Sequence, residues 1–187
     1  QLGLSPQIMQ AIEKKGYVQA TPIQVGAIPC FMEWKDVIAK APTGTGKTFA
    51  FGIPMVEHID PADSQLQALV LAPTRELALQ IQDELRDLCA FKEGVRVACL
   101  YGGQPIDKQI TQLKKLPQIV VATPGRLMDH MKRRTVRLDK VQTVVLDEAD
   151  RMLDMGFVQD VTHILDKMPK RRNLGMFSAT ISREVLD

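Results

Sequence analysis

The sequence is poor in cysteine and lacks a pair spaced as in metal or redox motifs. Its three cysteines, Cys30, Cys89 and Cys99, are an odd number without a C-x-x-C pair, which argues against a disulfide framework and against a zinc site. We therefore expect buried, reduced thiols in a cytosolic protein.

Long apolar runs and a strong charge of either sign are also absent. No apolar run approaches the roughly 18 residues that cross a bilayer, and no charged-then-apolar signal opens the chain, so we expect a soluble, cytoplasmic protein. The 24 Lys and Arg against 22 Asp and Glu leave a net charge of only +2. Any contact with nucleic acid must therefore be local.

The chain of 187 residues, 45% of them hydrophobic, is long enough to bury one core, and we expect one domain over residues 1–187. Short apolar runs alternate with segments of helical period, which predicts an α/β fold with a parallel sheet covered by helices on both faces. The expected strands are residues 36–41, 67–72, 95–101, 118–122, 141–146 and 173–177. The expected helices are residues 47–59, 75–91, 105–114, 125–133 and 158–167, preceded by one from Ser5 to Gly16 and one opened by Thr21 and Pro22.

The strongest signal is the segment 41–48, Ala-Pro-Thr-Gly-Thr-Gly-Lys-Thr, between an expected strand and an expected helix. This context is typical of a phosphate-binding loop, in which backbone N–H groups surround the phosphates and the lysine reaches the β and γ oxygens. Ala41 replaces the first glycine of the usual pattern, and a simple helix-capping turn is the alternative. The predicted nucleotide ligands are Thr43, Gly44, Thr45, Gly46, Lys47 and Thr48, with the Thr48 hydroxyl on Mg²⁺.

An acidic pair follows the apolar strand expected at residues 141–146. Ligands of open α/β sheets bind at the carboxyl ends of strands, where Asp147 and Glu148 would lie. We expect Asp147 to hold Mg²⁺, through water, and Glu148 to orient and deprotonate the attacking water. The alternative is that the acidic cluster only caps the next helix. Combined with the loop that contains Lys47, the pair predicts turnover of a nucleoside triphosphate with Mg²⁺, with Lys47, Asp147 and Glu148 as the catalytic residues.

The tetrad Asp147-Glu148-Ala149-Asp150 resembles the motif of the DEAD-box RNA helicases, and the resemblance extends over nearly all of the chain. Further segments similar to motifs of that family occur in order: Gly16-Tyr17 with residues 20–24, then 73–77, 102–103, 123–126 and 178–180. The resemblance implies an N-terminal RecA-like P-loop NTPase domain, with Q-motif helices in residues 1–35 and the P-loop core in residues 36–187. The resemblance favours bacterial members of the family.

The resemblance also implies that Tyr17 and Gln24 bind the adenine. A carboxamide pairs with the N6 donor and N7 acceptor of adenine, whereas guanine offers only acceptors there, so ATP should be preferred over GTP by about fivefold to 150-fold. The alternative for Gln24 is a helix capping box with Thr21.

The family's RNA-contacting motifs fall on loops that follow expected strands. Only nine aromatic residues occur in the chain and none is clustered there, which favours contacts to the RNA backbone with little sequence specificity. Taken singly, each arginine could instead be solvated or paired with a neighbour, and the basic runs 132–134 and 170–172 are expected to be solvated surface. The implied RNA-contacting residues are Pro73, Thr74, Arg75, Gly102, Gly103, Thr123, Pro124, Gly125 and Arg126.

Ser178 and Thr180 lie in the motif that, in this family, links the ATP state to the RNA grip, and the implied contact is a hydrogen bond to Asp150. Covalent catalysis is not expected, because no G-x-S-x-G segment surrounds Ser178 and the three histidines form no pattern.

The chain stops before the second RecA-like domain that family members need, and we expect it to be an excised fragment. That domain supplies arginines to the γ-phosphate, and an arginine finger is worth about 10³ to 10⁵ in rate, so the fragment is expected to bind ATP and ADP, to hydrolyse weakly and not to unwind duplexes. The alternatives are a nucleotide-binding regulatory or scaffold module and a DNA helicase domain. A GTPase is excluded because Asn173 is the only asparagine, which leaves no guanine-reading Asn-Lys-x-Asp motif.

Overall fold

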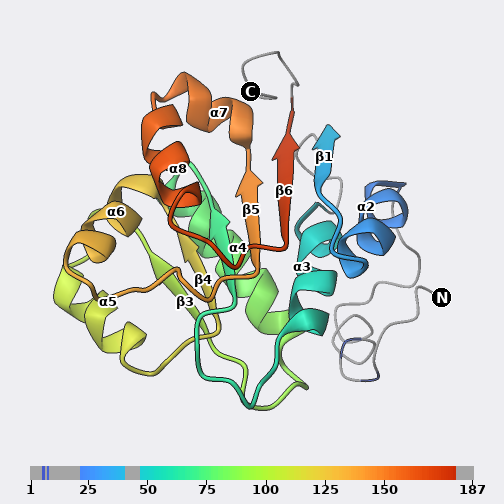
Figure 1. Cartoon of the computed structure of the whole chain (residues 1–187), viewed down its shortest axis with the longest axis horizontal. Helices are drawn as coiled ribbons and strands as arrows, with labels where there is room; N and C mark the ends of the chain where they lie inside the picture. Colours follow the sequence, from blue (N-terminus) through green and yellow to red (C-terminus); the bar gives the residue numbers. More distant parts are fainter. Residues whose placement is uncertain (1–5, 7, 9–21, 41–46, 180–187) are drawn as a thin grey trace.

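The computed structural model describes Pro6, Ile8 and residues 22–40 and 47–179. Its centre is a six-stranded sheet in the order β1-β6-β5-β2-β4-β3, in which every neighbouring pair is parallel. All carboxyl ends therefore lie at one edge, toward which the arrows of β5 and β6 point in Figure 1. The strands are β1 Val37–Lys40, β2 Ala68–Leu71, β3 Val97–Leu100, β4 Ile119–Ala122, β5 Thr143–Asp147 and β6 Asn173–Ser178.

Helices cover both faces of the sheet, as the α/β pattern predicted (Figure 1). Alternate residues of one strand serve the two cores: Ala68 and Val70 point to one, Leu69 and Leu71 to the other. The helices on the first face are α2 Pro22–Met32, α3 Lys47–His58 and α4 Arg75–Leu88. Those on the second face are α5 Ile106–Leu113, α6 Pro124–Lys132, α7 Ala149–Asp154 and α8 Val158–Leu165.

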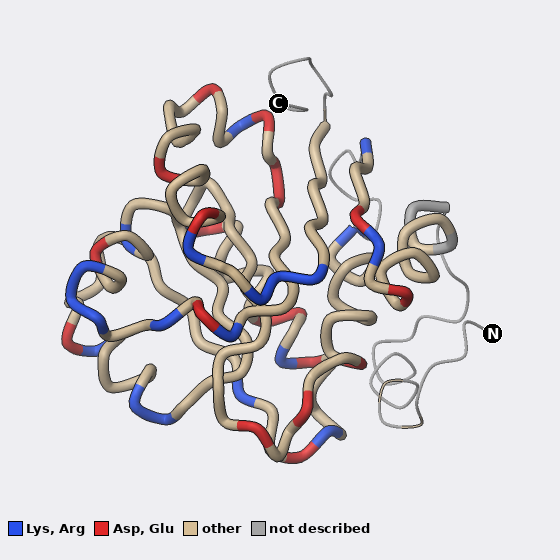
Figure 2. Tube along the Cα trace, viewed as in Figure 1, with Lys and Arg blue, Asp and Glu red and all other residues tan. Residues whose placement is uncertain are grey.

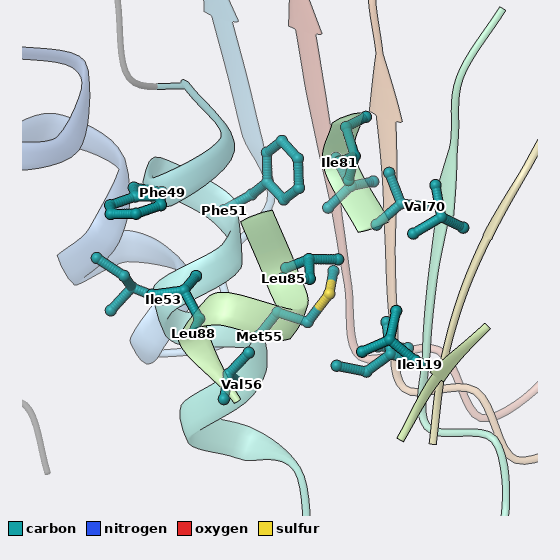
Figure 3. Close-up of a cluster of buried hydrophobic side chains, with 14 of the residues drawn as sticks. Phe49, Phe51, Ile53, Met55, Val56, Val70, Ile81, Leu85, Leu88 and Ile119 are labelled. Carbon is teal, nitrogen blue, oxygen red and sulfur yellow. The ribbon is translucent and has the colours of Figure 1, made fainter. Parts of the chain in front are cut away.

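The first core is filled by apolar side chains of α3, α4 and the sheet, which interleave in Figure 3. Phe51 of α3 packs against Phe177 of β6 with ring centroids 5.3 Å apart and planes tilted by 55°. The buried thiols of Cys89 and Cys99 join this core, and burial raises the pKa of each to about 12, which makes them inert. Cys30 is half-buried and, like the other two, free of a disulfide.

The expected strands and the five expected helices from residue 47 onward are all present, and no end differs from its predicted position by more than three residues. Helix α2 begins at Pro22, as its N-terminal signal predicted, whereas the helix expected between Ser5 and Gly16 lies almost wholly outside the described residues. Helix α7 was not predicted, because its six residues are too short to show a helical period. No helix in the described ranges is both long enough and apolar enough to span a membrane.

One basic run behaves differently from the prediction of simple solvated surface. The guanidinium carbon of Arg172 lies 3.9 Å from the centroid of the Trp34 ring, and that ring also stacks on His58 at a centroid distance of 3.9 Å. Arg172 therefore joins the segment before β6 to the turn before β1 by a cation–π contact, and the stack of Trp34 on His58 joins that turn to the end of α3.

Gly175 lies on β6 and packs against the Phe31 ring of α2, and a methyl group at this position would overlap that ring. We expect Gly175→Ala to lower the free energy of unfolding by about 1–3 kcal/mol, the usual penalty for overpacking. Urea unfolding measures the change. Gly26→Ala is the matched control, because Gly26 lies in α2 with open space around it and should gain up to about 1 kcal/mol from helix propensity. An unchanged stability of Gly175→Ala would contradict the packing described here.

Candidate functional site

The carboxyl edge of the sheet brings Lys47, Asp147 and Glu148 together. Lys47 opens α3, while Asp147 ends β5 and Glu148 follows it. The Lys47 Nζ atom lies 3.1 Å from Asp147 Oδ1 and 3.4 Å from Glu148 Oε2. Two motifs about a hundred residues apart in the chain thus form one ion-pair cluster. Thr48, the other described residue of the predicted phosphate loop, is buried in the first turn of α3.

Asp147 is the most constrained member of the cluster, with 0% of its surface exposed. Its Oδ1 accepts a hydrogen bond of 3.0 Å from the Glu148 N–H and faces Lys47. Its Oδ2 is buried and has no hydrogen-bond partner among the described residues. Burial raises the pKa of Asp147 to about 6, an effect that the Lys47 ammonium opposes and the Glu148 charge adds to. A buried carboxylate oxygen without a partner fits a magnesium ion or one of its bound waters, because Mg²⁺ prefers oxygen ligands.

Glu148 has a left-handed backbone, with φ 52° and ψ 52°, which is rare for a residue other than glycine. It occupies the N-cap position of α7, yet its side chain makes no capping hydrogen bond. The carboxylate instead reaches Lys47 Nζ and Arg151 Nη1, each at 3.4 Å. The capping alternative therefore does not describe this glutamate, whose backbone strain aims its side chain into the cluster.

A hydrogen bond ties α7 to the end of β6. Ser178 Oγ accepts from the backbone N–H of Asp150 at 3.1 Å, and Ser178 is buried. The contact implied between Ser178 and Asp150 is thus present and involves the main chain of Asp150. Thr180, the other residue of this motif, lies outside the described residues.

The predicted adenine site is described only in part. Gln24 is buried in the first turn of α2, on the face of the sheet that α3 also covers. The remaining predicted nucleotide ligands lie outside the described residues, so that the phosphate loop is described from Lys47 onward. These ligands are Tyr17, Thr43, Gly44, Thr45 and Gly46.

The nine predicted RNA-contacting residues lie at the same edge, on the turns after β2, β3 and β4 and on the first residues of α4 and α6; these three strands are neighbours in the sheet. Thr74 caps α4, its Oγ1 accepting from the Leu77 N–H at 3.2 Å. Thr123 is the N-cap residue of α6 and Pro124 its first residue, while Gly125 is exposed. Pro73 and Pro124 are buried and shape the turns.

Arg75 and the Gly102–Gly103 turn meet at the end of β3. The exposed Arg75 places its guanidinium carbon 5.2 Å from the centroid of the Tyr101 ring. Gly103 has φ +95°, and a Cβ there would lie 3.6 Å from Arg75 Nη1. The positive φ makes glycine the favoured residue at this turn.

Arg126, one of the predicted RNA-contacting residues, is paired with neighbouring side chains and a main-chain carbonyl. Its side chain is only 15% exposed, with Nε 3.8 Å from an Asp129 carboxylate oxygen. Its Nη1 donates to the Gln104 carbonyl at 2.8 Å and to Gln109 Oε1 at 3.2 Å. Pairing with neighbours, the alternative from the sequence, is what the structure shows. Arg126 fixes the turn that carries Gly102 and Gly103.

Gln109 and His130 were missed by the sequence analysis, and both are 0% exposed. Gln109 Nε2 donates to the Tyr101 carbonyl at 2.8 Å and to Gln104 Oε1 at 3.0 Å. Gln109 Oε1 is therefore an acceptor, so His130 Nε2, 2.9 Å away, must carry the proton. His130 Nδ1 then accepts from Thr135 Oγ1 at 2.7 Å. Burial lowers the pKa of His130 to about 4, which keeps the ring neutral in this network.

The pKa of Asp147 predicts how stability depends on pH. The folded chain holds this proton up to about pH 6, whereas the unfolded chain releases it near the ordinary value of 3.8. The free energy of unfolding should therefore fall by up to about 3 kcal/mol as pH rises from 4 to 7, because each pKa unit corresponds to about 1.4 kcal/mol. Asp147→Asn should lack this fall. The measurement is urea unfolding without nucleotide of the original chain and of Asp147→Asn, each at pH 4.5 and 7.5. The difference between the two pH dependences isolates Asp147, because all other titrating groups are common to both proteins. Parallel pH profiles would contradict the burial of an ionisable Asp147.

The polar network around Gln109 predicts a second effect on stability. Gln109→Leu keeps the size of the side chain but leaves Arg126, His130 and the Tyr101 carbonyl without their partner. We expect a loss of about 2–3 kcal/mol in the free energy of unfolding, because buried polar groups without partners are costly. Gln112→Leu on the same helix, whose side chain is partly exposed, should change stability by less than about 0.5 kcal/mol. Equal effects of the two substitutions would show that the network contributes nothing.

Comparison with known proteins agrees with this geometry. The family model of the DEAD/DEAH box helicases matches residues 21–187. The chain is 54% identical over 181 residues to the DEAD-box ATP-dependent RNA helicase CshA of Geobacillus kaustophilus, covering 97% of this chain and 38% of that protein. It is 53% identical over 178 residues to the Bacillus subtilis CshA helicase, covering 95% of this chain and 36% of that protein.

Solved structures are similar over almost the whole chain. A DEAD box protein from Methanococcus jannaschii superposes with a TM-score of 0.93 at 43% identity, covering 98% of this chain and 50% of that one. A hypothetical ATP-dependent RNA helicase from Sulfolobus tokodaii gives a TM-score of 0.91 at 38% identity, covering 98% of this chain and 53% of that one. This chain belongs to the DEAD/DEAH box helicase family and has the RecA-like fold of its solved members.

Proposed function

We propose that this chain is the ATP-binding and ATP-hydrolysing half of an ATP-dependent RNA helicase that remodels or locally unwinds RNA duplexes. The observation that carries the proposal is the Lys47 ammonium held between the carboxylates of Asp147 and Glu148. The chain spans less than two fifths of the CshA helicases that it resembles. We therefore assign unwinding to a two-domain helicase in which a domain of this kind is one half.

The chemistry follows from the three side chains of the cluster. Lys47 exchanges its carboxylate partners for phosphate oxygens when ATP binds, because the ammonium donates to either kind of oxygen. Asp147 and Thr48 would hold Mg²⁺, which supplies positive charge against the phosphates when bound. Release of Lys47 frees Glu148 to accept a proton from the attacking water. The strained backbone of Glu148 keeps this carboxylate at the cluster rather than at the helix N-terminus.

Adenine is the base that this site suits. Gln24 supplies a carboxamide with one donor and one acceptor, and we assign it to N6 and N7 of adenine. Asn173 cannot read guanine, because its side chain accepts from Thr143 Oγ1 at 2.6 Å and donates to the Lys35 carbonyl at 3.2 Å inside the fold. ATP and ADP are therefore the proposed ligands, with Tyr17 beside the ring.

RNA is the proposed partner of the three turns after β2, β3 and β4. Arg75 is exposed there and offers a cation beside the exposed glycines of the Gly102–Gly103 turn. The small glycines and the exposed charge of Arg75 would allow a sugar-phosphate backbone to approach closely. The second RecA-like domain would complete both the RNA clamp and the γ-phosphate site.

Calorimetric titration with Mg²⁺ present tests the proposal. ATP and ADP should bind, GTP should bind at least about fivefold more weakly, and Gln24→Ala should erode that preference. Lys47→Ala should abolish measurable binding, whereas Lys108→Ala, which removes an exposed lysine of α5, should leave it unchanged. Equal binding of GTP would overturn the role of Gln24, and unchanged binding by Lys47→Ala would overturn the proposal itself.

The same samples test the need for a second domain. With ATP, Mg²⁺ and single-stranded RNA at saturation, the chain alone should hydrolyse slowly and without RNA stimulation, because an arginine finger contributes about 10³ to 10⁵ in rate. Phosphate release measures the turnover. Robust RNA-stimulated hydrolysis by this chain would show that the domain is complete without a partner.

A further inference from the structure

A cavity of about 460 Å³ lies at the amino edge of the sheet, opposite the edge that holds Lys47 and Asp147. It is formed by the segments that lead into β2, β4 and β5, at residues 64–66, 113–120 and 134–140. Its volume is within the range of about 300–1,000 Å³ found for ligand pockets. Nothing in the ATP chemistry uses this edge.

The floor of the cavity is apolar and its rim carries an exposed leucine. Leu113, Val120 and Val136 are buried at the base and belong to the second core. Leu116 stands on the rim with 52% of its surface exposed. Together these side chains offer a surface that favours burial of one large apolar side chain.

The rest of the rim is cationic. Arg134, Arg137 and Lys140 line the cavity and are exposed, against a single carboxylate, Asp139. None of the three cations forms an ion pair within the described ranges. In Figure 2 basic segments follow α5 and α6 at the left and lower left of the view, away from the edge toward which β5 and β6 point. The rim of the cavity therefore carries more positive than negative charge.

The rim is also held in an unfavourable backbone conformation. Leu116 and Arg134 both have φ 59°, and they are two of the four residues other than glycine with positive φ in the described chain. Helices often end in a residue with this left-handed conformation, but that residue is normally glycine or asparagine, because most other side chains cost about 1–2 kcal/mol in this conformation. Arg96 maintains the strain by donating to the Lys115 carbonyl at 2.7 Å and to the Leu116 carbonyl at 2.9 Å.

We propose that this cavity is the docking site of an acidic peptide segment of a partner protein. A large apolar side chain of the peptide fills the cavity against Leu113, Val136 and Leu116. Flanking carboxylates of the peptide pair with Arg134, Arg137 and Lys140. The strained Leu116 turn presents the apolar side chain to the peptide, which glycine at this position could not do.

The chemistry of the lining favours a peptide over RNA. The cavity has no aromatic side chain on which a base could stack, and its apolar floor offers a nucleotide no hydrogen bond. A carboxylate-rich peptide with an apolar anchor matches both the floor and the rim. Because the cavity is at the edge of the sheet opposite Lys47, a bound peptide leaves the nucleotide site open.

Selection from a displayed library of random 12-residue peptides on this chain tests the proposal. The enriched peptides should carry Leu, Met, Phe or Trp flanked by Asp and Glu. The best of them, labelled and titrated by fluorescence anisotropy, should bind at least tenfold more weakly to the variant Arg134→Glu, Arg137→Glu, Lys140→Glu. The control variant Lys167→Glu, Lys170→Glu, Arg171→Glu has the same change in net charge on exposed residues outside the cavity and should change the affinity less than twofold.

Leu116→Gly separates docking from folding. Glycine relieves the positive φ, so the melting temperature should not fall, yet removal of the apolar rim should weaken the peptide at least fivefold. Unchanged affinity for ADP with Mg²⁺ verifies that each variant is folded, independently of whether the helicase assignment is right. Enrichment of no peptide, enrichment of peptides without acidic residues, or equal binding to all variants would overturn the proposal. It would also be overturned if only a labelled single-stranded RNA lost affinity for the triple cavity variant, which would assign the surface to RNA.

Discussion

The site depends on one arrangement, a lysine ammonium buried beside a fully buried carboxylate. The cost of burying the Lys47 charge is offset by the Asp147 and Glu148 carboxylates, which lie within 3.4 Å of it. The cost of burying the Asp147 charge is offset in turn by Lys47. Even so, burial raises the pKa of Asp147 to about 6, so that ionising this carboxyl costs more in the folded chain than in water. Replacement of a buried ion pair by apolar residues of similar size is often neutral or stabilising for a fold. A strained glutamate and, among the described residues, a carboxylate oxygen without a hydrogen-bond partner in one cluster support the proposal that this cluster binds phosphate and a divalent cation.

The parallel topology explains why the predicted motifs meet. Every strand ends at the same edge, so that residues following β2, β3, β4 and β5 line it together although they are far apart in the chain. The polar network around Gln109 then fixes the turns after β3 and β4 relative to each other, because one buried amide contacts both. The two arginines at this edge differ in role: Arg126 is largely buried and holds the turn after β3 by its bond to the Gln104 carbonyl, whereas Arg75 keeps its charge at the surface.

The sequence was informative where local pattern decides structure. Apolar runs predicted all six strands, and the strand-loop-helix context of Lys47 predicted its position at the sheet edge. Three features were beyond this reasoning. The left-handed backbone of Glu148 results from tertiary contacts, Arg126 found partners on another helix, and the Gln109 to His130 hydrogen bond joins helices 21 residues apart in sequence. For the last of these features the sequence did contain a signal: Gln109 is a polar residue within the stripe of α5 formed by positions 106, 109, 110 and 113, which is otherwise apolar.

Strained, left-handed backbone conformations occur at both edges of the sheet. Glu148 at the carboxyl edge and Leu116 and Arg134 at the amino edge share the left-handed conformation, in which an asparagine or glycine would be more stable. At Glu148 the strain has an evident use, since the side chain must reach Lys47. At Leu116 the Arg96 guanidinium donates to two successive carbonyls, while the leucine side chain is 52% exposed and belongs to neither hydrophobic core of the described residues. A supported strain that exposes an apolar side chain beside three unpaired cations is best explained by a partner that covers it.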